Sequence, residues 1–207
     1  HYGYDERFFI DLAVVASACN ILDPSDRWHV SPTAGIAWNI AREGFMAGSH
    51  AVNLFKVRAS AGIINTANIP YQGYWYNQMG GGYGYPLNNS WGQNNNSWGE
   101  ANMPSIGGTT EKAYKYNVGI DATFYNSFNL TVDAWMEQRK DIWVNSTYGN
   151  SAILGATSSY ANEGRVDSKG FEIGLNWYKD LGAGWKMTLG GTYSLTKNKV
   201  KEMMEQP

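Results

Sequence analysis

The side chains that most often perform catalysis or bind metals are few in this sequence, and they show no useful spacing. His1, His29 and His50 are not spaced for shared metal binding or proton transfer, and Cys19 has no recognisable base beside it. A nucleophilic or acid–base site needs such partners within hydrogen-bond reach. We therefore expect a protein that is not an enzyme and that has no metal site and no cofactor.

A second group with chemical potential consists of aromatic and amide side chains between residues 65 and 110. Flat rings offer stacking area at low entropic cost, and amides both donate and accept hydrogen bonds, which suits sugars or peptides. We predict that this stretch is a contact surface, with packing of the rings within the loop itself as the alternative. The candidate contact residues are Tyr74, Trp75, Tyr76, Trp91 and Trp98.

A third group is charged and alternates with apolar residues in a hairpin that runs from Lys115 to Trp143. Asp121, Asp133, Glu137 and Arg139 lie on the opposite side from the apolar residues. A period of two predicts strands. Each arm has about the 9 to 11 residues that cross a bilayer as a tilted strand, whereas soluble strands are usually nearer 5 or 6. The pattern favours a membrane barrel whose charged residues face a wet lumen.

The same alternation recurs along the chain and predicts an all-β, antiparallel fold of about seven strands. The charged fraction of 16% is low for a soluble domain, and aromatic residues reach 14%. The sequence contains no run of about 18 apolar residues, so it predicts no transmembrane helix. The net charge of -2 gives no basic surface for nucleic acid, which we exclude as the main partner.

The connections alternate between short and long. The turns at 126–129 and 180–184 are short, whereas the loops at 65–110 and 145–164 are long. Outer-membrane barrels have short periplasmic turns and longer extracellular loops. We therefore predict that the two long loops are extracellular, which also places 19–27 outside and 42–53 on the periplasmic side.

Tryptophan and proline positions add two expectations. Trp38, Trp177 and Trp185 fall near predicted periplasmic strand ends, as an aromatic girdle requires, and packing in a soluble core is the alternative. Pro32 falls inside a predicted strand. Because proline lacks an N–H, we expect a bulge, a strand end or another break in the ladder there.

Several segments resemble the barrel of SusC/RagA-type TonB-dependent transporters, the outer-membrane nutrient importers of the Bacteroidetes. The most specific is Asn162-Glu163-Gly164 followed by Lys169-Gly170-Phe171-Glu172. The matches span nearly the whole chain in family order. The other matching segments are Tyr4 to Phe8, Ser31 to Ile40, Val57 to Gly62, Asn68 to Pro70, Glu111, Tyr116 to Asp121 and Lys140 to Ile142.

The resemblance implies that residues 1–207 are part of the C-terminal barrel portion of such a transporter, without its plug and N-terminal domains. About seven strands would belong to a plugged barrel of roughly 22 strands. The implied location is the outer membrane of a Gram-negative cell, in contact with its lipid. The implied partners are a SusD-like surface lipoprotein and the TonB complex, which acts through the missing N-terminal part.

The implied function is uptake of oligosaccharides or peptides, with no chemistry performed on the substrate. The loop aromatics would contact the substrate or the partner lipoprotein. Asp121, Asp133, Glu137 and Arg139 would line the transport route or hold the plug, or would simply form a solvated lumen wall. The alternatives are a secreted or surface β-sandwich that binds glycans, and a siderophore importer.

Overall fold

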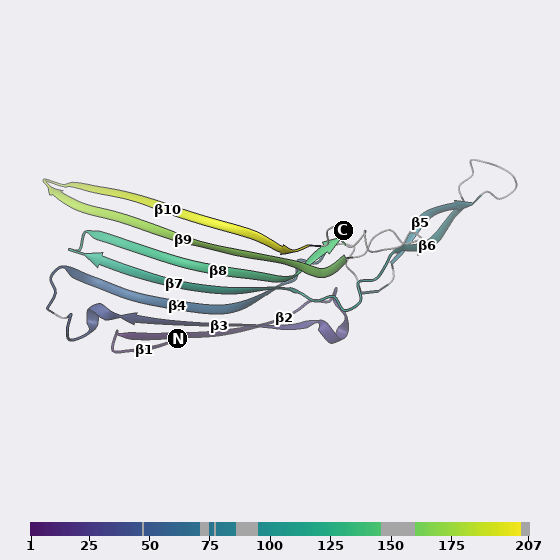
Figure 1. Cartoon of the computed structure of the whole chain (residues 1–207), viewed down its shortest axis with the longest axis horizontal. Helices are drawn as coiled ribbons and strands as arrows, with labels where there is room; N and C mark the ends of the chain where they lie inside the picture. Colours follow the sequence, from purple (N-terminus) through teal and green to yellow (C-terminus); the bar gives the residue numbers. More distant parts are fainter. Residues whose placement is uncertain (47, 71–74, 77, 86–94, 146–159, 204–207) are drawn as a thin grey trace.

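One antiparallel sheet dominates the computed structural model, which describes residues 1–46, 48–70, 75–76, 78–85, 95–145 and 160–203. Within these ranges, eight strands pair in the order β1-β2-β3-β4-β7-β8-β9-β10 (Figure 1). The strands are β1 (Tyr2–Tyr4), β2 (Phe8–Ala18), β3 (Trp28–Asn39), β4 (Val52–Thr66), β7 (Glu111–Phe124), β8 (Phe128–Asn145), β9 (Tyr160–Gly182) and β10 (Trp185–Glu202). The predicted all-β class is therefore confirmed.

The sheet contains one more strand than the seven predicted, and several of its strands are longer than a membrane crossing requires. The additional strand, β1, pairs with β2 across a tight turn in which Asp5 and Glu6 have φ of 50° and 51°. Three residues are too few to show a period. β8 has 18 residues and β9 has 23, so both exceed the 9 to 11 that a membrane crossing needs.

The predicted irregular stretch 65–110 contains a second, two-stranded sheet. β5 (Gln78–Tyr85) pairs with β6 (Asn95–Asn102), and this hairpin projects past the end of the large sheet (Figure 1). Its strands are rich in Gly and Asn, which have low β-propensity, so the sequence pattern does not reveal them. The predicted loop 145–164 is also shorter, because β8 ends at Asn145 and β9 begins at Tyr160.

The two longest connections and the tight turns of the large sheet lie at opposite ends of it, whereas the β3–β4 connection at the short-turn end, residues 40–51, is longer than the β2–β3 connection, residues 19–27, at the other end. The β7–β8 and β9–β10 turns lie at one end, and the segments after β4 and β8 leave from the other (Figure 1). Tyr125, Asn126 and Ala183 adopt positive φ in the short turns. Two short 3-10 helices follow the predicted parity: η1 (Pro24–Asp26) lies at the long-loop end and η2 (Ile40–Arg42) at the short-turn end.

One face of the large sheet is apolar and has no second sheet against it. Val118 and Leu195 on this face are 55% and 52% exposed. Among the described residues the buried apolar side chains are only Leu22, Ala113, Ala122 and Trp143. A β-sandwich would cover this face, so the sandwich alternative is wrong. One row of the apolar face joins Ile10, Ile36, Ala59, Val118, Ala134, Phe171 and Leu195.

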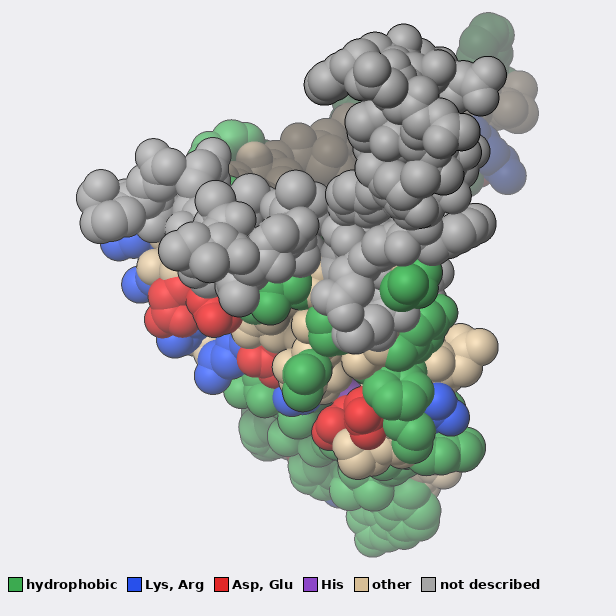
Figure 2. Space-filling model, turned by 90° about the vertical axis from the view of Figure 1, so that its right-hand side faces the viewer, with side chains coloured by type: hydrophobic (Ala, Val, Ile, Leu, Met, Phe, Trp, Pro, Cys, Tyr) green, Lys and Arg blue, Asp and Glu red, His purple; other side chains and the backbone are tan. Residues whose placement is uncertain are grey.

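The apolar rows have the extent of a membrane barrel. On β7 they run from Tyr116 to Phe124, which at about 3.4 Å per residue is roughly 27 Å along the strand, close to the ≈ 25 Å lipid-facing band of outer-membrane barrels. Figure 2 looks along the strands from the long-loop end, and hydrophobic side chains gather at the bottom of this view, on the side where Figure 1 shows β1 to β3. In the described part of the chain, no helix has the length and hydropathy of a membrane span.

The three tryptophans predicted to form a girdle lie at the short-turn end of this face. Trp38 stacks on Phe8 with ring centroids 6.0 Å apart, and Trp177 stacks on Phe128 at 5.7 Å. Trp38 and Trp185 are 39% and 73% exposed, so packing in a soluble core is excluded for both. Exposed rings at the end of an apolar band are typical of an interfacial aromatic girdle.

Pro32 interrupts pairing on only one side of its strand. It pairs with Val14 of β2 without a register shift, so the expected break is absent there. The β3–β4 ladder ends at the neighbouring pair, Thr33 and Gly62. Because Pro32 has no N–H to donate, loss of the β4 ladder at this point is the expected result.

Candidate functional site on the polar face of the sheet

The face opposite the apolar rows is polar, and we call it the inner face. Its residues alternate with the apolar ones along each strand, as the period of two requires. Most of its charges are contributed by β4, β7 and β8, which are consecutive in the sheet. One row of the inner face joins Phe9, Ala37, Arg58, Gly119, Asp133, Glu172 and Ser194.

Arg58 is the centre of a polar cluster that links three strands. Its Nε lies 3.0 Å from Asp121 Oδ2, and its Nη2 lies 2.7 Å from Asp133 Oδ2. Nη1 also donates to Asn117 Oδ1 at 3.3 Å. The Asn117 amide in turn donates to Asp133 Oδ1 at 3.1 Å. We call these four side chains the Arg58 cluster.

The Arg58 cluster requires a glycine beneath it. Gly119 lies in register between Arg58 of β4 and Asp133 of β8. A Cβ at Gly119 would lie 2.7 Å from Arg58 Cζ and 2.7 Å from Asp133 Oδ1. The guanidinium therefore crosses β7 directly over the glycine backbone, and a larger residue would push it away from Asp133.

Nearer the long-loop end, further ion pairs continue along the inner face. Arg139 Nη2 lies 2.6 Å from Glu111 Oε2, and Lys115 Nζ lies 3.5 Å from Glu137 Oε2. Glu111 is only 3% exposed, so its pairing with Arg139 compensates a buried charge. Each pair joins β7 to β8, and the inner face therefore carries a ladder of charges whose partners lie on neighbouring strands.

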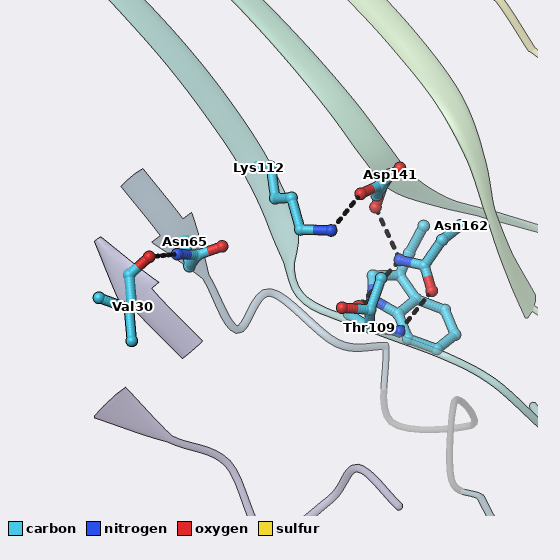
Figure 3. A network of polar contacts seen from close by, with 7 residues as sticks. Val30, Asn65, Thr109, Lys112, Asp141 and Asn162 are labelled. Atoms are coloured by element: carbon cyan, nitrogen blue, oxygen red, sulfur yellow. Dashed lines mark hydrogen bonds and ion pairs between the residues drawn. The ribbon is translucent and has the colours of Figure 1, made fainter. Parts of the chain in front are cut away.

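At the long-loop end, a polar network ties the segment before β7 to β8 and β9 (Figure 3). The Asn162 amide group donates to Thr109 O at 3.0 Å and to Asp141 O at 2.6 Å, while its Oδ1 accepts from Thr109 N at 2.9 Å. Trp143 Nε1 also donates to Thr109 O at 3.0 Å. Lys112 Nζ lies 2.9 Å from Asp141 Oδ2. We call these residues the mouth network.

Local backbone irregularities make the mouth network possible. The β8–β9 register shifts between Arg139 and Ile142, and Asp141 within the shift has φ of 58°. Such a bulge redirects side chains. A Cβ at Gly108 would collide with Trp143 Cη2, so the indole ring packs directly on the glycine.

The structure places all four predicted lumen-facing residues on the inner face. It joins Asp121 and Asp133 through Arg58, and it places Glu137 beside Arg139 with Oε1 and Nε 4.0 Å apart. Whether they line a transport route stays a prediction.

The predicted aromatic contact residues are only partly described. Trp75 and Tyr76 form a T-shaped pair with centroids 5.9 Å apart, and Tyr76 is 50% exposed. The backbone of Trp98 pairs with Gly81 in the β5–β6 hairpin. Tyr74 and Trp91 lie outside the described residues. Their role as substrate or partner contacts stays a prediction.

The sequence interpretation missed two central residues. The alternation along its strand predicts only that Arg58 faces inward, because the partners of its side chain are 63 and 75 residues away in sequence. Asn162 belongs to the most specific matching motif, and its three hydrogen bonds give that motif a structural reason. Gly164 of the same motif is also constrained, because a Cβ there would lie 2.9 Å from Val144 Cγ1 and 3.0 Å from Ile142 Cβ.

Neither the inner face nor the rest of the described chain offers a recognisable metal centre. Over the described ranges, no three residues among His, Cys, Asp and Glu are grouped so that they could hold a metal ion. Four inner-face carboxylates, Glu111, Asp121, Asp133 and Glu137, are instead paired with Arg58, Lys115 and Arg139. The chemistry available to this face is binding through charges and amides.

Comparison with known families agrees with this arrangement. The family described as "TonB dependent receptor-like, beta-barrel" matches residues 7–205. The chain belongs to the TonB-dependent receptor-like β-barrel family. The family match confirms the predicted resemblance to TonB-dependent transporters, whose barrels lie in the outer membrane.

Two curated relatives from Formosa agariphila match nearly the whole chain. TonB-dependent receptor P39 is 22% identical over 214 residues, which cover 99% of this chain and 19% of that protein. TonB-dependent receptor P26 is 22% identical over 220 residues, covering 98% of this chain and 20% of that protein. The chain thus spans about one fifth of the length of these relatives.

Solved structures show the same fold. The RagAB peptide importer in its open-open state matches with a TM-score of 0.82 at 16% identity, over 98% of this chain and 21% of that chain. The FrpB iron transporter from Neisseria meningitidis matches with a TM-score of 0.54 at 13% identity, over 85% of this chain and 20% of that chain. The described sheet is therefore a segment of a TonB-dependent receptor barrel, with β1 and β10 at its two edges.

Proposed function

We propose that the chain forms part of the lumen wall of a TonB-dependent outer-membrane importer that takes up oligosaccharides or peptides. The observation that carries this proposal is the contrast between the two faces of one sheet. Its apolar face is uncovered and its inner face holds cross-strand ion pairs. Charges are costly in lipid and stable in a wet lumen, so the two faces fit lipid and water respectively.

The Arg58 cluster and the ion pairs above it give the lumen wall a fixed charge pattern. Asp133 is 17% exposed and Asp121 is 29% exposed at the side chain, so each remains accessible to water while paired with Arg58. Glu172, opposite Asp133 in the row, is exposed. This wall would contact a hydrated substrate, or the plug, through carboxylates and amides.

The long-loop end would face outside the cell and meet the substrate and a SusD-like lipoprotein. Two observations support this assignment. The β5–β6 hairpin projects past that end of the sheet, and the mouth network fixes the segment that returns from the hairpin to β7 (Figures 1 and 3). A fold shared with the RagAB peptide importer agrees with a peptide substrate. The TonB complex would act through the part of the protein that precedes this segment.

Uptake by cells that express the full-length protein tests the proposal. Fluorescent oligosaccharides and peptides are offered to a strain with the protein, to its deletion strain and to a TonB-deficient strain. We expect accumulation of one substrate class only when both protein and TonB are present. A ferric siderophore serves as the third substrate. Its selective uptake would favour the siderophore alternative, and equal uptake of all three classes by every strain would contradict the importer.

A further inference from the structure

The apolar face changes character abruptly toward the long-loop end, on β9 and β10. Phe171 and Leu195 pair in the last apolar row of these strands. The next positions of the same face are Lys169 and Lys197, which lie directly opposite each other. Lys199 and Lys201 continue along β10. We call Lys169, Lys197, Lys199 and Lys201 the outer lysine cluster.

Two grooves meet at the outer lysine cluster. One has a volume of about 240 Å³ and is lined by the four lysines together with Met136, Asp167 and Ser168. The other has a volume of about 540 Å³, and its lining includes Val118, Phe171 and Leu195 of the apolar face. Both grooves are lined by Met136, Lys169 and Lys197. An apolar furrow on the lipid-facing side therefore opens into a basic one.

The positive charge of the cluster is only partly compensated. Asp167 Oδ2 lies 3.9 Å from Lys201 Nζ, and Asp167 also pairs with Arg165 at 3.7 Å. Across the part of the chain that the structure describes, Lys169, Lys197 and Lys199 form no ion pair. Like charges directly opposite on neighbouring strands destabilise a sheet. The pair of Lys169 and Lys197 is therefore a position where a bound anion would stabilise the fold.

We propose that the outer lysine cluster binds the phosphate group of an anionic lipid in the outer leaflet, with an acyl chain in the adjoining apolar groove. The proposal rests on the proposed function, because it needs the apolar face to lie in a membrane. The lysines occupy the level where the apolar band ends, which is where lipid head groups lie. Basic pockets at this level bind anionic head groups. A free phosphate ion would leave the apolar groove without a role.

Lipid binding by the full-length protein in nonionic detergent tests this site. Native mass spectrometry would compare phosphatidic acid with phosphatidylcholine of the same acyl chains. The triple variant Lys169→Gln/Lys197→Gln/Lys199→Gln should bind phosphatidic acid on the order of 100-fold more weakly, since each lysine near an anionic surface contributes about fivefold. The matched control is Lys179→Gln/Lys186→Gln, at the short-turn end of β9 and β10, which should bind like the unmodified protein.

Three outcomes would overturn the lipid site. They are equal affinity of the triple variant and the control, equal affinity for both lipids, and full displacement of the lipid by inorganic phosphate at the same concentration. A spin label at Val118 in the full-length protein separates this failure from failure of the proposed function. If the label at Val118 lies in lipid while the triple variant binds phosphatidic acid as tightly as the unmodified protein, only the lipid site is wrong. If Val118 lies in water, the membrane assignment is wrong as well.

Discussion

The two faces of the same strands differ in their side-chain contacts: side chains on the inner face form hydrogen bonds and ion pairs with particular partners, whereas the aliphatic side chains on the apolar face do not. On the apolar face, neighbours such as Val118 and Ala134 share a row without any polar contact. On the inner face one residue away, Asn117 and Asp133 are joined by a hydrogen bond of 3.1 Å within the Arg58 cluster. The apolar face thus needs only hydrophobicity, because lipid adapts to its shape. The inner face needs particular residues at particular registers.

The largest expected effect comes from placing a charge in the middle of the apolar face. Ile120→Lys in the full-length protein should lower the free energy of unfolding from phospholipid vesicles by about 2–4 kcal/mol, the cost of a lysine near the bilayer midplane. Thr131→Lys, which pairs with Asp121 on the inner face, is the matched control and should change stability by less than about 1 kcal/mol. Equal effects of both substitutions would abolish the distinction between the faces.

The stability of the mouth network should depend on the hydrogen bonds of one side chain, that of Asn162. Asn162→Ala removes three hydrogen bonds with backbone groups and should cost about 1–3 kcal/mol. Hydrogen exchange of the full-length protein should speed up locally around Thr109 and Asp141. Asn198→Ala on exposed β10 serves as the control. Unchanged protection in Asn162→Ala would show that the loop segment is held by other contacts.

The Arg58 cluster should contribute less to the free energy of unfolding than the mouth network does, because its side chains are partly exposed and solvent screens their charges. Arg58→Ala should lower stability by about 1 kcal/mol, and Gly119→Ala by a similar amount through displacement of the guanidinium. The control is Arg42→Ala, whose ion pair with Glu6 is 61% and 72% exposed and should contribute almost nothing. Denaturant unfolding of the full-length protein measures all three. Equal losses for Arg58→Ala and Arg42→Ala would argue against a specific inner-face cluster.

The smallest effect lies outside both faces, in the β2–β3 connection. The pKa of the Asp23 carboxyl is lowered from its ordinary value of 3.8, chiefly because the Ser25 backbone N–H donates to it, and also because the Ser25 hydroxyl does. Asp23 is the N-cap of η1. Because its pKa is lowered in the folded state, the ionised carboxylate stabilises the fold above pH 3.8, and this stabilisation is lost as the pH falls from there through the lowered pKa. Carboxyl NMR of the labelled protein should show Asp23 titrating below its ordinary value of 3.8. Titration of Asp23 at its ordinary pKa would contradict the cap.

Alternation in the sequence predicted the strands of the large sheet because the two faces meet different solvents. The spacing predicts that the apolar residues of the hairpin from Lys115 to Trp143 share one face, and the β7–β8 register places Val118, Ile120, Leu130 and Val132 together on it. The β5–β6 hairpin escaped prediction because Gly and Asn strands have no such contrast. The partners of Arg58 were also out of reach, since a register between strands 63 or 75 residues apart has no signal in one sequence.

The assignment of the two faces is tested most directly by spin labels placed one at a time from Asn117 to Phe124 in the full-length protein in lipid vesicles. We predict that collision with oxygen is highest at Val118, Ile120 and Ala122, and that collision with a water-soluble nickel complex is highest at the residues between them. The expected result is that the collision rates of both reagents alternate from one residue to the next, with the maxima for oxygen at the minima for the nickel complex. Uniform access of the nickel complex along β7 would contradict the account.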